Sequence, residues 1–137
     1  MHEEVLRRFF EGAAETTDLT RDLHGALVPD GSGVTRHPIV DMAEQFEVRP
    51  THLVKVCDAV LGGSVQIELL EAIGFCLVAS DAFHWDTDSP EGERVAEVAY
   101  DWSAPEINYP LTLPNVVAWR RRLLGEGARF ETKPPVA

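Results

Sequence analysis

The stretch Ser64–Trp85, SVQIELLEAIGFCLVASDAFHW, is the longest apolar-rich block in this chain of 137 residues. Two glycines precede it, and acidic residues follow it. Its middle is apolar almost all the way round, which predicts burial on most sides. We expect one helix across the stretch, with Ser64 capping the first turn. Helical spacing is kept by four of its apolar residues, Leu69, Ile73, Cys76 and Leu77.

A shorter helix followed by a buried strand over residues 74–80 is the alternative, because Gly74 is unfavourable in the middle of a helix. A membrane span is not expected here. Glu71 and Asp81 leave only nine uncharged residues between them, whereas a span needs about 20.

Length and composition fit one globular domain. With 45% hydrophobic residues, the chain has enough apolar material for one core. We assign residues 1–126 to this domain and expect residues 127–137 to be a flexible tail. The N-terminus shows no secretory signal pattern, and the two cysteines, Cys57 and Cys76, lack metal or redox spacing. These features indicate reduced core thiols in a cytoplasmic protein.

The flanking segments are mainly helical in pattern. A helix begins near residue 2 and is interrupted near Asp18, which can cap a second one. Pro50–Leu61 has a helical stripe with two glycines after it. Thr112 opens the last helix, which Gly125 ends. Residues 35–48 fit either short strands or a helical turn.

The C-terminal half is expected to contain a β-hairpin. Apolar and charged residues alternate over Arg94–Trp102, and alternation returns over residues 107–111 after a turn. The resulting fold class is α+β: a mainly helical single domain with a small antiparallel sheet, or hairpin, packed on the central buried helix.

Charge is distributed unevenly along the chain. The net charge is −11, which argues against nucleic acid and anionic membrane as partners. Residues 81–101 carry seven acids and one base, whereas the segment from residue 111 to the end has five bases and two acids. The first segment therefore holds over half of the net charge.

Carboxylates mixed with aromatic residues are typical of a surface that recognises a cationic partner, because the acids steer the approach and the aromatics supply contact area. We therefore expect a small cytoplasmic interaction module that binds a basic protein, such as an antagonist or immunity-type protein. A homodimer contact is also open. The expected binding residues are Asp86, Asp88, Glu91, Glu93, Glu97, Asp101, Trp102 and Glu106.

Two other functions compete with this one. His84 with Asp86 or Asp88 has the chemistry of a metal-assisted hydrolase, although the spacing of a known metal motif is missing. Residues 41–60 have the rhythm of a helix-turn-helix regulator, but Lys55 is the main cation of the second helix. No phosphate-binding glycine loop, nucleophile elbow or paired cysteine and histidine ligands occur, so we expect no cofactor and favour a protein that is not an enzyme.

Overall fold

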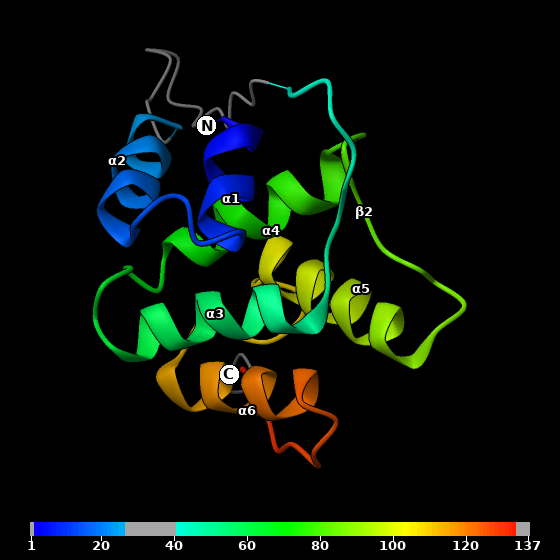
Figure 1. Ribbon diagram of the computed structural model, residues 1–137. Helices are drawn as coiled ribbons and strands as arrows, with labels where there is room; N and C mark the ends of the chain where they lie inside the picture. Colours follow the sequence, from blue (N-terminus) through cyan, green and yellow to red (C-terminus); the bar gives the residue numbers. More distant parts are fainter. Residues whose placement is uncertain (1, 27–40, 134–137) are drawn as a thin grey trace.

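The computed structural model describes residues 2–26 and 41–133, and this part of the chain is mainly helical. The pair α1–α2 lies at one end of the molecule and α6 at the other (Figure 1). Two short strands form a parallel two-stranded sheet. The elements are α1 (Glu3–Phe10), α2 (Thr16–Ala26), β1 (Phe46–Glu47), α3 (Pro50–Leu61), α4 (Leu69–Ala79), β2 (Phe83–His84), α5 (Pro90–Ser103) and α6 (Leu113–Leu123).

Up to residue 133, where the described part of the C-terminal half ends, there is no antiparallel hairpin, so the expected α+β class is wrong. Residues 94–102 belong to α5, whose buried residues Val95, Val98, Ala99 and Trp102 follow a helical period. The alternation predicted that Tyr100 shares a face with Trp102, but Tyr100 is 56% exposed and Trp102 is fully buried. Local signals favour the helix as well. Ser89 caps it, a proline occupies its first turn, and two acids lie there.

The central helix is also shorter than expected. Neither the single helix over 64–85 nor the strand over 74–80 forms, because α4 ends at Ala79 and the chain then turns into β2. Ser80 makes this turn. Its backbone is extended, and its Oγ accepts hydrogen bonds from the amides of Ala82 and Phe83 at 3.0 and 3.1 Å. The same hydroxyl donates to the carboxylate of Glu3, which is fully buried.

The helices expected at Pro50–Leu61 and after Thr112 are confirmed. Thr112 Oγ1 accepts the amide hydrogen of Asn115 at 3.2 Å, as an N-cap residue should. The glycines that stop the two helices, Gly63 and Gly125, have φ values of 81° and 79°, a conformation that glycine adopts readily. Helices α3 and α6 pack against each other and run in opposite directions (Figure 1).

The ambiguous segment 35–48 is resolved only in part, since residues 35–40 lie outside the described residues. From residue 41 onward it has no helix and contains β1, which pairs in parallel with β2. Phe46 aligns with Phe83 in this pairing. Their rings pack together with Phe10 and His52, which ties the strands to α1 and α3.

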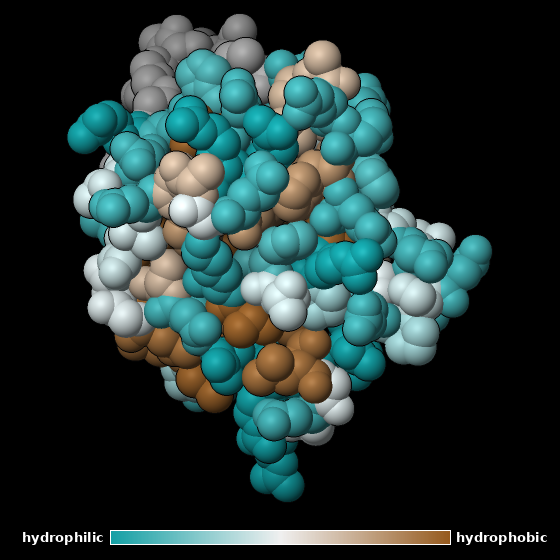
Figure 2. Space-filling view, viewed as in Figure 1, coloured by the Kyte–Doolittle hydropathy of each residue, from teal (hydrophilic) through white to brown (hydrophobic). Residues whose placement is uncertain are grey.

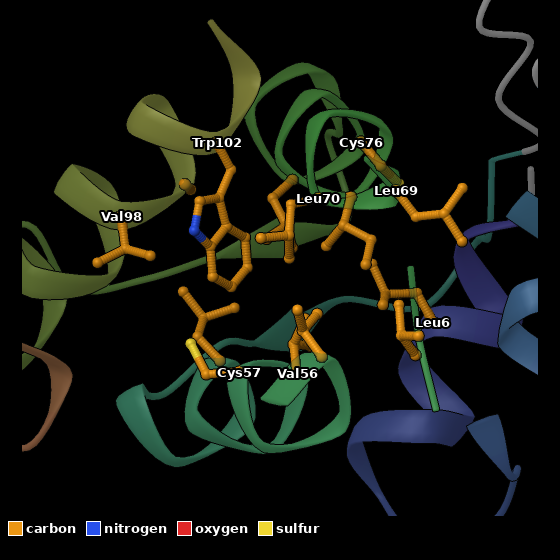
Figure 3. Close-up of a cluster of buried hydrophobic side chains, with 14 of the residues drawn as sticks. Leu6, Val56, Cys57, Leu69, Leu70, Cys76, Val98 and Trp102 are labelled. Atoms are coloured by element: carbon orange, nitrogen blue, oxygen red, sulfur yellow. The ribbon is translucent and has the colours of Figure 1, made fainter. Parts of the chain in front are cut away.

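The core lies between α4 and its neighbours. The side chain of Trp102 points from α5 into the space between α4 and α3, near Leu70 and Cys57 (Figure 3). Its ring meets that of Trp119 edge-on, at a centroid distance of 6.2 Å and an angle of 89°. The most extensive helix pair is α4 with α5, and at Gly74 they lie so close that an added Cβ atom would be 2.6 Å from the backbone nitrogen of Ser103.

Candidate functional site

The acidic loop before α5 projects from the body of the molecule (Figures 1 and 2). Asp86, Asp88, Glu91 and Glu93 are all exposed, and none of them forms an ion pair with another described residue. We call these four residues the acidic turn. They lie close to the positive end of the α5 dipole, which stabilises carboxylates and so contributes to their clustering.

Hydrogen bonds fix the backbone of the acidic turn. The Ser89 hydroxyl donates to the Asp86 carbonyl at 3.0 Å and accepts the amide of Gly92 at 3.0 Å. The Asp86 side chain accepts the amide of Asp88 at 2.9 Å. The four carboxylates are therefore held on an ordered turn, which lowers the entropic cost of binding a partner.

Other predicted site residues lie outside this turn. Glu97 is held by Arg122 across the α5–α6 contact, at 2.8 Å from Nε and 2.6 Å from a terminal guanidinium nitrogen. Glu106 is exposed beyond the end of α5. Trp102 belongs to the core and offers no contact area to a partner. Sequence reasoning could not separate these roles, because they depend on which face of α5 each residue occupies.

Asp101 is a structural acceptor in the core rather than a surface charge. It is buried, and its Oδ2 accepts the indole N–H of Trp119 at 3.0 Å. Burial raises the pKa of Asp101 above its ordinary value, and the hydrogen bond from Trp119 opposes this shift. The ionised form of Asp101 therefore loses free energy on burial that a neutral side chain at this position does not lose.

Substitution of Asp101 by asparagine should therefore raise the free energy of unfolding at pH 7, since asparagine keeps an acceptor for Trp119 without the charge. A raised folded pKa means that the native state binds more protons than the unfolded state above pH 3.8, so wild-type stability falls as pH rises through this window. The free energy of unfolding of the asparagine variant should therefore exceed that of the wild type by more as the pH rises through this window. Urea unfolding followed by circular dichroism at several pH values measures it.

The alanine variant at position 101 is the control. It leaves the Trp119 N–H without an acceptor and should lose about 1–2 kcal/mol of stability. If the asparagine variant at neutral pH were as unstable as the alanine variant, the assignment of Asp101 as an acceptor whose charge is dispensable would be wrong.

The geometry does not support the metal alternative. His84 is exposed on β2, while the Asp86 side chain accepts the amide hydrogen of Asp88 within the acidic turn. Across residues 2–26 and 41–133, no group of three or more histidine, cysteine, aspartate or glutamate side chains could hold a metal ion. A metal site normally needs at least three converging ligands.

The helix-turn-helix alternative lacks its first helix, because residues 41–49 are extended or bent and α3 follows directly. Its main cation is also occupied. The Lys55 Nζ donates to the Phe9 carbonyl at 2.5 Å and lies 4.6 Å from the centre of the Phe9 ring. Lys55 thus stabilises the C-terminal end of α1.

Sequence reasoning identified the buried stripe of α6 but not the opposite one. Leu113, Val117 and Leu124 are 55%, 44% and 47% exposed, and their spacing places them on one side of the helix. We call these three residues the α6 apolar face. Apolar residues gather over the α3–α6 region in the lower half of Figure 2. The spacing of Leu113, Val117 and Leu124 was visible in the sequence, but they were not recognised as a second, exposed apolar stripe beside the buried one.

A hollow of about 310 Å³ is lined by one residue of the acidic turn, Glu91, and by one residue of the α6 apolar face, Leu124. Arg49 and Arg94 also line it. The three arginines of α6 add little net charge nearby, because each is paired with a carboxylate: Arg120 with Asp58, Arg121 with Glu126 and Arg122 with Glu97.

The cysteines are structural. Cys57 and Cys76 are both buried, and burial raises the pKa of each thiol to about 12. A nucleophilic cysteine requires the opposite shift.

Comparison with models of protein families gave no match, and comparisons with curated proteins and with solved structures gave no significant match. Among the described residues, no helix combines the length and the apolar character that crossing a membrane requires.

Proposed function

We propose that this protein is a small interaction module whose acidic turn captures a basic protein partner. The observation that supports it is the exposure of four carboxylates on an ordered, projecting turn with no ion pair to another described residue. Such a carboxylate field attracts a cationic surface over about 10 Å at ordinary ionic strength and accelerates encounter.

The α6 apolar face gives the partner an area to bury next to these charges. A stable interface has an apolar centre and a polar rim. Here Leu124 belongs to the apolar part and Glu91 to the rim, and both border one hollow. An antagonist or immunity-type protein that neutralises a cationic toxin or nuclease in the cytoplasm is the class that fits this arrangement. A second copy of the chain is the alternative occupant.

The test replaces Asp86, Asp88 and Glu91 together by Asn, Asn and Gln. A partner captured from the native host by the wild-type protein is purified, and its association rate constant is measured by stopped flow at low and high salt. We expect association at low salt to slow by about 10-fold in the triple variant, with much less difference at high salt, because steering is screened.

A charge-matched control removes three exposed acids elsewhere. Glu11, Glu15 and Glu68 lie outside α5 and its loop, and their Gln variants change the net charge by the same amount. The control should associate at close to the wild-type rate. Equal rates for the wild type and the acidic-turn variant at low salt would refute the proposal.

A further inference from the structure

A cavity of about 520 Å³ lies at the opposite end of the molecule from α6, between α1 and α2. Its volume is within the range of small-molecule sites. It is separate from the acidic turn, and nothing in the proposed function uses it. Its lining residues are His2, Val5, Arg8, Ala13, Ala14, Asp18, Arg21 and Asp22.

The two aspartates in the lining are already engaged. Asp22 accepts the backbone amide of His2 at 2.7 Å with one oxygen and approaches His2 Nδ1 at 2.6 Å with the other. Asp18 accepts the amide of Glu15 at 3.1 Å, which ties it to the first turn of α2. Their charges are therefore partly compensated from within the wall of the cavity.

The formal charges of Arg8 and Arg21 in the lining are balanced by those of Asp18 and Asp22, but neither arginine forms an ion pair with another described residue. Both are exposed, and they come from the two helices that form the cavity. The guanidinium group presents paired N–H donors that match the oxygens of a carboxylate or a phosphate. Arg7 contrasts with them, since it lines a neighbouring hollow but lies within 3.6 Å of three carboxylates, those of Glu4, Glu11 and Glu44.

We propose that this cavity binds a small molecule with a carboxylate or phosphate group, held by Arg8 and Arg21 and oriented by His2. The contact with Asp22 makes Nδ1 of His2 the donor, so Nε2 of the neutral ring is an acceptor and can orient a hydroxyl group of the ligand or the protonated oxygen of hydrogen phosphate. The group that these ligands share is an oxyanion, and the rest of the ligand packs against Val5 and Ala14.

Nuclear magnetic resonance titration of the full chain with inorganic phosphate, and separately with citrate, tests this proposal and distinguishes the two oxyanion sources. Sodium chloride at matched ionic strength is the reference. We expect saturable amide shifts in α1 and α2 for at least one probe in the millimolar range. The double variant Arg8→Gln/Arg21→Gln should weaken binding of that probe by at least about 10-fold.

Two further variants separate specific binding from general electrostatics. Arg121→Gln/Arg129→Gln removes the same charge at exposed positions beyond the cavity and should bind like the wild type. Ala13→Phe places a large ring on an exposed residue of the lining and should block binding without a change of charge. Absence of saturable shifts with both probes, or equal affinity in the Arg8→Gln/Arg21→Gln variant, would overturn the proposal.

Discussion

Replacement of Gly74 by alanine should destabilise the protein by about 3 kcal/mol, against the ordinary preference of a helix for alanine. A Cβ atom at this position would lie 2.6 Å from the backbone nitrogen of Ser103 and 2.7 Å from Cβ of Trp102. Non-bonded carbon contacts normally lie at about 3.5–4.0 Å, so α4 and α5 would have to separate. Separation would loosen the packing of Trp102, which is one of two fully buried tryptophan side chains among the described residues.

Helix propensity alone would make the alanine variant more stable than the wild type by about 1 kcal/mol. Whether the substitution raises or lowers the free energy of unfolding therefore distinguishes propensity from steric contact. Urea unfolding followed by tryptophan fluorescence should show a lower midpoint, and the melting temperature should fall by about 10 °C or more.

Gly127→Ala is the matched control, because no heavy atom lies within 4 Å of its added Cβ. Its stability should stay within about 0.5 kcal/mol of the wild type. An alanine at position 74 that raised stability would show that the helices do not meet there.

Gly74 is also an example of a feature that the sequence alone could not explain. Its unfavourable position in a helix was visible and raised the strand alternative, but the reason for the glycine lies on α5, in a part of the chain some 30 residues away. Helices α3 and α6 were predictable, because the glycines that stop them and the Thr112 cap of α6 are local signals and their apolar stripes are clear. Helix α5 carries equally good local signals at Ser89 and Pro90, yet an apparent alternation of apolar residues outweighed them.

The site was predictable in composition but not in geometry. The sequence indicated a loop over residues 86–93; Asp86 and Asp88 do lie in a loop, whereas Glu91 and Glu93 lie in the first turn of α5. It could not show that Glu97 is paired with Arg122 or that Asp101 serves Trp119, since both contacts join α5 to α6. The cavity between α1 and α2 was not foreseen either, because no local motif predicts that residues 20 positions apart, His2 and Asp22, will meet.

Gly92→Ala should have the second-largest effect, a loss of about 2–3 kcal/mol, because the first turn of α5 has no room for a side chain there. The added Cβ would lie 1.6 Å from the carbonyl oxygen of Asp86 and 2.4 Å from its carbonyl carbon. That oxygen cannot move freely. It accepts the hydroxyl of Ser89 at 3.0 Å and the Ser89 amide at 3.2 Å. Displacement would break both bonds and weaken the N-cap, each worth about 1 kcal/mol.

This substitution also tests whether the acidic turn must be ordered to work. Gly92→Ala leaves all four carboxylates and the net charge unchanged, so a loss of partner affinity beyond that caused by global unfolding would come from the position of the charges. Urea unfolding gives the stability, and amide hydrogen exchange at Asp88 and Gly92 reports the hydrogen bonds of the turn. Glu93→Ala is the control for the stability of the helix, because this exposed residue lies in the same first turn of α5. It should cost less than about 1 kcal/mol. If Gly92→Ala had the stability and amide exchange rates of the wild type, the Asp86 carbonyl would not be held against α5. The acidic turn would then be a flexible loop, and its carboxylates would attract a partner without a fixed arrangement.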